Sequence, residues 1–209
     1  NGIIKAMGHD VACGMGNVAI LSNVFAGSAA TPAGAEVKVL AHYQNLAAWR
    51  RRPQERGGRP PRVWFAGREV ADVYATFADI QLTPEPVIEI SGASGVPMLL
   101  AMAAGRSWHG HVPGPNGLPG GYPVRLAGGE LELALPDGVS AAEAITWNAS
   151  FEEANGLVVS PEGGVRFTGI LRDRLTEHVP ALRDGFPVRD LEAVCEELLR
   201  LRAALMETP

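Results

Sequence analysis

The sequence predicts an α/β to α+β protein, with a Rossmann-like α/β first half and a mixed or antiparallel second half. Strand-like and helix-like segments alternate over residues 1–105, which favours an α/β unit. Hairpin patterns interleave with helical periodicity over residues 106–209, which favours antiparallel pairing. Glycine and proline, with 25 and 16 residues, divide the chain into short elements. We therefore expect a dinucleotide-binding unit over 1–105 and a substrate-contact region over 106–209, with a single domain as the alternative.

The first half contains five segments with a clear pattern. The helix at Asn17–Gly27 rests on Val18, Leu21 and Phe25, which lie at helical spacing before the stop at Gly27. The others are, in order, a β-branched strand at Glu36–Tyr43, a short helix over 45–51 that breaks at Pro53, a hairpin at Arg62–Val70 turning at Gly67-Arg68, and a strand, tight turn and apolar helix at Pro86–Gly105.

The second half contains hairpins and two longer helices. We expect a hairpin at Tyr122–Leu135 turning at Gly128-Gly129 and another around Gly163-Gly164. Ser140 and Glu143 form a capping box before a helix that ends near Asn155-Gly156. Val188–Leu205 is an amphipathic helix, with one face formed by Leu191, Val194, Cys195, Leu198, Leu201 and Leu205. That apolar face favours a homo-oligomer, most simply a homodimer.

Composition and charge exclude several classes of protein. A net charge of −5 gives no electrostatic attraction for nucleic acid or an anionic membrane. No apolar run reaches the roughly 18 residues of a membrane span, and no signal peptide opens the chain. Cys13 and Cys195 lie near opposite ends, which favours reduced thiols. We therefore expect a cytoplasmic protein that binds neither nucleic acid nor membrane.

A glycine pattern near the N-terminus points to a nucleotide. Gly14, Gly16 and Ala19 have the G-x-G-x-x-A spacing that is similar to a dinucleotide-binding fingerprint over these few positions. The glycines allow a tight turn and a close approach to pyrophosphate, and the helix N-terminus faces the anion. We expect Gly14, Gly16 and Asn17 to bind NAD or NADP; a plain helix start is the alternative. The strand at Glu36–Tyr43 ends without an acid for the ribose.

Six arginines follow that strand in a Gly- and Pro-rich segment. They are Arg50, Arg51, Arg52, Arg56, Arg59 and Arg62. One interpretation is a solvated loop. The other is a clamp for the 2′-phosphate of NADP, because guanidinium groups match phosphate geometry.

The segment Ser91–Gly95 offers a second candidate site. A loop between a strand and a helix is where α/β proteins bind ligands, so Ser91 and Ser94 are candidate substrate contacts and Glu89 a candidate base. A nucleophile elbow would need glycine where Val96 stands, which argues against serine hydrolase chemistry.

The stretch from His109 to Val124 is the third candidate. His109 and His111 are two residues apart, so an extended chain directs both rings to one face. An imidazole titrates near neutral pH, which suits a general acid or base. The Gly/Pro-rich loop that follows contributes Asn116 and Tyr122 as substrate contacts. The other histidines are scattered, so we expect no metal site.

These observations favour an NAD(P)-dependent oxidoreductase acting on a small hydroxy, keto or amino acid, with a histidine as general acid/base. One alternative is a cofactor-free lyase, isomerase or hydrolase that uses Glu89, Ser91 or Ser94 together with His109 and His111. The other is a non-catalytic interaction subunit in which the Gly/Pro-rich loop is an interface.

Overall fold

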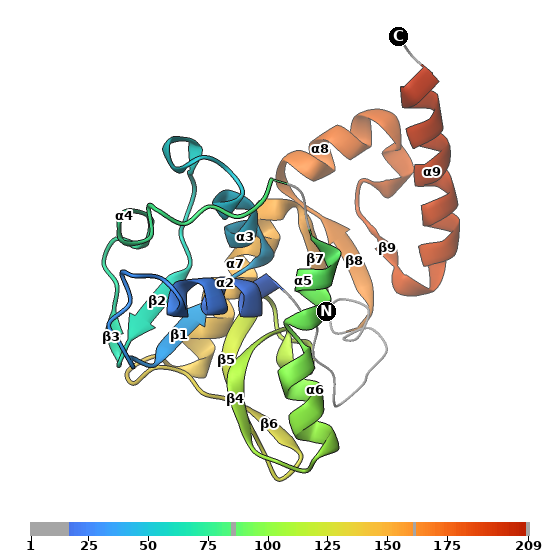
Figure 1. Ribbon diagram of the computed structural model, residues 1–209. Coiled ribbons are helices and arrows are strands. Elements are labelled where there is room, and N and C mark those ends of the chain that lie inside the picture. Colours follow the sequence, from blue (N-terminus) through green and yellow to red (C-terminus); the bar gives the residue numbers. More distant parts are fainter. Residues whose placement is uncertain (1–16, 85–86, 161, 208–209) are drawn as a thin grey trace. The chain divides into compact units, whose positions relative to one another are not determined.

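The structure, a computed structural model, describes residues 17–84, 87–160 and 162–207 (Figure 1). Within these residues the protein has a mixed α/β fold with three small sheets, each of three strands. Every strand pair among the described residues is antiparallel. The expected α+β character is compatible with this fold, whereas the parallel sheet of a Rossmann-like first half is not shown.

The described chain divides into two compact units between Phe151 and Glu152. We call residues 17–151 the N-terminal unit and residues 152–207 the C-terminal unit. The expected boundary near Arg106 lies inside the N-terminal unit, where β4 contacts α2 and β5 contacts β1.

The first sheet of the N-terminal unit has a helical layer on one face. Its strands are β1 (Val37–Leu40), β2 (Arg62–Phe65) and β3 (Arg68–Glu69). The helices are α2 (Asn17–Ala26), α3 (Tyr43–Trp49) and the single turn α4 (Val73–Thr76). A 3₁₀ turn at Pro53–Glu55 follows α3. The core between sheet and helices is a cluster that includes Leu21, Phe25, Val39, Trp49, Val63 and Phe77.

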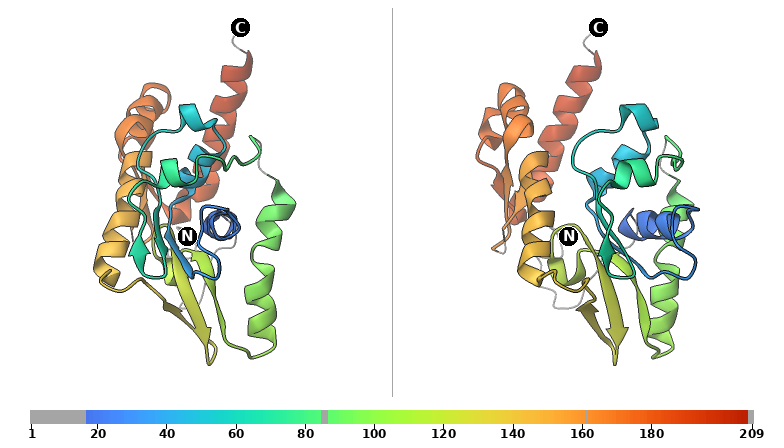
Figure 2. Two further views of the ribbon diagram at one scale, coloured as in Figure 1. Left: turned by 60° about the vertical axis from the view of Figure 1, so that its left-hand side comes forward. Right: turned by 90° about the vertical axis from the view of Figure 1, so that its left-hand side faces the viewer.

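The second sheet completes the N-terminal unit. Its strands are β4 (Trp108–Pro113), β5 (Gly121–Ala127) and β6 (Glu130–Leu133). The helices are α5 (Ile88–Ala93), α6 (Val96–Ala103) and α7 (Ala141–Asn155), which runs across the unit boundary. The second core cluster contains Leu40, Trp64, Met98, Val112, Tyr122, Val124 and Ala144. The views in Figure 2 show α2 lying across β1 and β4, and both contacts are extensive.

The C-terminal unit is built around the third sheet. Its strands are β7 (Leu157–Val159), β8 (Gly164–Phe167) and β9 (Phe186–Pro187), with helices α8 (Gly169–His178) and α9 (Leu191–Glu207). 3₁₀ turns lie at Pro180–Leu182 and Val188–Asp190. Phe167, Val179, Leu182 and Val194 form its core.

Most hairpins and longer helices predicted from the sequence are confirmed. The turn of the first hairpin is one residue earlier than expected, because Ala66 and Gly67 are the residues with positive φ. Ser140 caps α7 by accepting the Glu143 N–H at 3.1 Å. On the predicted apolar face of α9, Val194 is buried, whereas Cys195 and Leu205 are exposed.

Two predicted segments are wrong in part. The segment expected as a strand before the Ser91–Gly95 turn is the helix α5, because a short apolar run suits either element and tertiary contacts decide. The strand at Glu36–Tyr43 ends at Leu40, and His42 caps α3 by accepting from the Gln44 N–H at 3.4 Å.

Gly120 provides a test of how tightly α7 packs on the loop between β4 and β5. Its φ is +70°, and a Cβ added there would overlap the buried side chain of Asn148. Gly128 has a similar φ of +60° with nothing within 4 Å of an added Cβ. A substitution at Gly128 therefore measures backbone strain alone, without steric overlap.

We expect Gly120→Ala to lower the free energy of unfolding by about 3 kcal/mol, since left-handed strain and overpacking add. Gly128→Ala should lower it by only about 1 kcal/mol. Urea denaturation of both variants measures the difference. Equal losses would contradict the packing described for Asn148.

Candidate functional site

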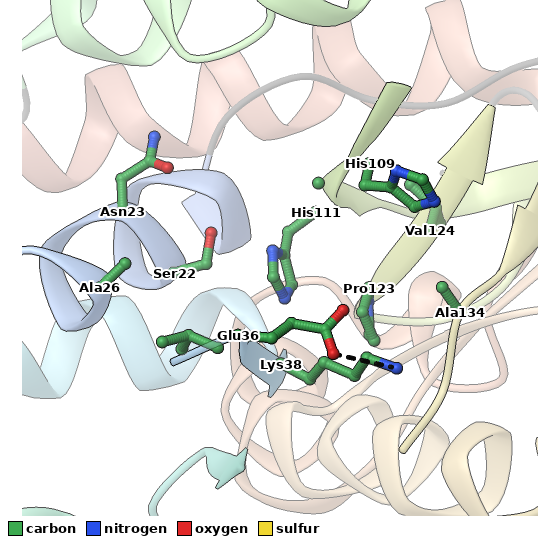
Figure 3. A pocket seen from close by; sticks show the side chains of 12 residues that line it. Ser22, Asn23, Ala26, Glu36, Lys38, His109, His111, Pro123, Val124 and Ala134 are labelled. Atoms are coloured by element: carbon green, nitrogen blue, oxygen red, sulfur yellow. Dashed lines mark ion pairs between the residues drawn. The ribbon is translucent and has the colours of Figure 1, made fainter. Parts of the chain in front are cut away.

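A pocket of about 230 Å³ lies in the N-terminal unit, between α2, β1, β4, β5 and the segment after β6 (Figure 3). Its polar side chains are Ser22, Asn23, Glu36, Lys38, His109 and His111. The rest of the lining is small or apolar, including Ala26, Pro123 and Ala134. The volume is below that of a site for a drug-sized ligand, so the pocket suits a small molecule or one end of a larger one.

His109 and His111 both line this pocket, as their spacing predicted. They lie on β4, where residues two apart share a face. Their burial differs: His111 is 8% exposed, whereas His109 is exposed to solvent. The stretch expected to be a loop is shorter than predicted, because β4 extends to Pro113 and β5 begins at Gly121.

His111 has a well-defined structural contact. Its Nε2 accepts a hydrogen bond from the Val39 N–H at 2.9 Å, so the neutral ring carries its proton on Nδ1. Burial, reinforced by the charge of Lys38, lowers the His111 pKa to about 3. The ring is therefore neutral near pH 7. These properties favour a role in holding β1 beside β4 over a role in proton transfer.

Two side chains of opposite charge line the wall of the pocket at β1. Lys38 Nζ lies 3.8 Å from Glu36 Oε2, and it donates to the Leu135 carbonyl at 3.3 Å. The Lys38 side chain is 21% exposed and that of Glu36 is 66% exposed. Such an exposed ion pair with a long N–O distance contributes little stability. A charged ligand can therefore replace either side chain as the partner of the other.

The nucleotide fingerprint is only partly within the described residues. Gly14 and Gly16 lie outside them, and Asn17 is the first residue of α2. Further along α2, Ser22, Asn23 and Ala26 line the pocket. The strand that follows α2 pairs antiparallel with β2, so the parallel βαβ setting of a dinucleotide fingerprint is not shown here.

The second predicted cluster lies in a helix and its end, not in a loop at a strand end. The Ser91 hydroxyl donates to the Val87 carbonyl at 3.5 Å, and the Ser94 hydroxyl donates to the Ser91 carbonyl at 2.7 Å. Neither serine, nor Glu89, lines the pocket with the histidines. The structure therefore does not bring together the residues of the cofactor-free alternative.

Asn116 and Tyr122 also lie apart from the pocket lining. Asn116 has a positive φ of 51° in the 3₁₀ turn Pro115–Gly117, which asparagine tolerates better than most residues. Tyr122 is fully buried in the second core cluster. The ring of Tyr122 therefore belongs to the core and packs against the second sheet.

The arginine cluster is largely engaged within the N-terminal unit. Arg56 stacks on Trp49 at 4.2 Å and donates to the Phe77 and Ile80 carbonyls. Arg59 stacks on Phe151 at 4.0 Å. Arg62 pairs with Glu69 and Glu143 at 2.7 and 2.6 Å. These contacts favour a structural role for three of the six arginines over a phosphate clamp.

Sequence reasoning missed Glu36, Lys38, Ser22 and Asn23 as pocket residues. The alternating pattern of Glu36–Leu40 places Glu36 and Lys38 on one face, which could have identified the charge pair. Nothing in the sequence shows that this face meets the histidines of β4.

Comparisons with protein-family models, with curated proteins and with solved structures give no match. Within the described residues, no group of three or more His, Cys, Asp or Glu side chains is arranged to hold a metal ion. Likewise, no helix in the described part of the chain has the length and apolar character needed to span a bilayer.

Two buried histidines make the N-terminal unit sensitive to acid. Besides His111, burial and then the charge of Arg59 lower the pKa of His42 to about 4. Each folded-state pKa lies below the ordinary value of 6.5. As the pH falls, the unfolded chain therefore takes up protons first. Stability is complete above about pH 6.5 and is lost progressively below it.

We expect each of these imidazoles to lower the free energy of unfolding by about 2 kcal/mol between pH 7 and pH 5. His111→Gln keeps an acceptor for the Val39 N–H but does not titrate, so it should remove about half of the loss. Urea denaturation at both pH values measures this. His178→Gln, at an exposed position, is the control. Parallel losses in wild type and His111→Gln would refute the assignment.

Proposed function

We propose that this protein is an NAD(P)-dependent oxidoreductase whose pocket binds a small acid with a 2-hydroxyl, 2-oxo or 2-amino group. The observation that carries the proposal is that an exposed histidine, His109, shares a small pocket with the cation Lys38. The pocket wall opposite β1 and β4 includes α2, the helix that directly follows the Gly14-x-Gly16 pattern.

His109 is the proposed general acid/base. His109 is exposed to solvent and a general acid/base must reach its substrate, whereas His111 is buried and neutral. In the oxidative direction His109 takes a proton from the 2-hydroxyl or 2-ammonium group of the substrate as the hydride leaves the adjacent carbon. In the reductive direction it returns a proton to the carbonyl oxygen or the imine nitrogen.

Lys38 is the proposed anchor for the substrate carboxylate. Its ammonium carries three N–H donors, and its contact with Leu135 uses one of them. A carboxylate on Lys38 would be held by a charge-assisted hydrogen bond. Because Pro123 and Ala134 also line the pocket, a short apolar side chain of the substrate has apolar neighbours.

The size of the pocket limits what a dinucleotide can do there. About 230 Å³ admits a nicotinamide ring beside part of a substrate but not a whole dinucleotide. We propose that Gly14, Gly16 and Asn17 hold the pyrophosphate outside the pocket. The nicotinamide, when bound, supplies or accepts the hydride.

The first test is a thermal-shift scan with NAD, NADP and their reduced forms, followed by a panel of small 2-hydroxy, 2-oxo and 2-amino acids. A ligand that binds only the folded state raises the unfolding midpoint as its concentration rises. A rise with one nicotinamide supports the proposal. If acids raise the midpoint and no nucleotide does, the pocket binds acids and the nicotinamide part of the proposal is wrong.

Turnover provides the second test, by nicotinamide absorbance with an acid that passes the scan. We expect His109→Gln to lower kcat by about 10²- to 10⁴-fold, because proton transfer from a placed side chain contributes that much. His178→Gln should leave kcat unchanged. Full activity in His109→Gln would show that His109 is not the general acid/base.

A further inference from the structure

The charge pair on β1 points to a finer description of the ligand. Glu36 and Lys38 are the acidic and basic side chains of the pocket; Glu36 lies directly before β1 and Lys38 on it. Residues two apart on an extended chain share a face. Figure 3 shows both side chains along the same wall, joined by the ion pair at 3.8 Å. A ligand with one positive and one negative group can replace this pair without leaving either charge unmatched.

The main chain of β1 repeats this arrangement of donor and acceptor. In its antiparallel pairing with β2, the Glu36 carbonyl accepts from the Ala66 N–H at 2.9 Å. N–H and C=O groups alternate between the two edges of a strand. Those of Val37 and Val39 therefore point away from β2. Outside the ladder of β1 with β2, no hydrogen bond among the described residues involves the Val37 main chain.

On the edge of β1 that faces away from β2, His111 and Gly121 bond to the main chain of Val39 and Ala41, and no continuous ladder forms among the described residues. The Val39 N–H donates to His111 Nε2 at 2.9 Å, and Ala41 exchanges hydrogen bonds with Gly121 at 2.7 and 3.3 Å. Val37, the first residue of β1, lines the pocket. Its N–H and C=O thus add a donor and an acceptor beside the ammonium of Lys38 and the carboxylate of Glu36.

We infer that the ligand of this pocket is a free α-amino acid, bound as the zwitterion. Its carboxylate pairs with Lys38 and the Val37 N–H, and its ammonium pairs with Glu36 and the Val37 carbonyl. This inference rests on the proposed function only for the identity of the pocket as the substrate site. Glu36 is then the specificity-determining residue that separates amino acids from 2-hydroxy acids.

The size and lining of the pocket set the side chain of the amino acid. A volume of about 230 Å³ encloses a small or medium-sized amino acid. Ala26, Pro123 and Ala134 contribute apolar surface without a further charge. The favoured side chains are therefore short and uncharged.

Calorimetric titration with matched ligands tests the inference directly. Alanine carries both charges, lactate carries only the carboxylate and ethylamine carries only the ammonium. We expect alanine to bind at least about tenfold more tightly than either, because a hydrogen bond between charged groups contributes that much. Glycine, serine and valine extend the series in size.

Variants of Glu36 and Lys38 test which side chain causes the preference for alanine. Glu36→Gln should bring alanine and lactate to within about threefold of each other, and Lys38→Met should weaken both by about tenfold or more. Glu130→Gln, at an exposed position on β6, is the matched control and should keep the preference. An unchanged unfolding midpoint shows that each variant is folded, as expected for a loose ion pair.

The outcomes separate this inference from the proposed function. Equal binding of alanine and lactate, or binding of neither, overturns the zwitterion site, whatever the His109→Gln kinetics show. A preference for alanine that survives Glu36→Gln overturns the role of Glu36. A preference that depends on Glu36, in a protein without nicotinamide-linked turnover, supports the zwitterion site and refutes the oxidoreductase.

Discussion

The close approach of β1, β5 and α2 at Gly121 is the constraint on which the N-terminal unit depends. Gly121 exchanges hydrogen bonds with Ala41, and its carbonyl also accepts from the Asn148 side chain at 3.2 Å. A Cβ at this position would lie 2.6 Å from the Val18 side chain. Only glycine lets a strand, a helix and a buried amide meet at one residue. The first two sheets are joined here.

The pocket exists because, in the described part of the chain, the pairing between the first two sheets is limited to one bridge. If β1 paired with its neighbour along its whole length, ladder hydrogen bonds would fill the space that the pocket occupies. Instead the pairing stops at Ala41 and Gly121, and the imidazole of His111 takes the next N–H of β1. A buried main-chain donor needs a partner, and a side chain supplies it without closing the gap.

Local patterns predicted the local elements, and they failed where distant contacts decide. The hairpins at Ala66-Gly67 and Gly128-Gly129 follow from residues with positive φ, which the sequence shows as glycine-rich turns. The shared face of His109 and His111 follows from strand geometry alone. In contrast, nothing local distinguishes α5 from a strand, since a short segment with alternating apolar residues such as Val87, Ile88 and Ile90 suits both.

The site itself was predictable only in part, for the same reason. His109 and His111 were found because the two imidazoles stand together in the sequence. Lys38 was not, because its place in the pocket depends on β1 lying beside β4, which follows about 70 residues later, as the hydrogen bond between Val39 and His111 shows. Tyr122 was predicted as a substrate contact because it stands beside a glycine-rich loop; its burial in the second core cluster favours a packing role.

The two histidines of β4 differ in burial, and this difference favours a structural role for one and a chemical role for the other. The buried ring of His111 acts as a neutral hydrogen-bond acceptor for the Val39 N–H. The same burial lowers the His111 pKa below the range that is useful for proton transfer near pH 7. Two residues earlier on the same face, His109 is exposed to solvent. The hydrogen bond from Val39 to His111 therefore links β1 to β4, and His109 lines the same pocket two residues away.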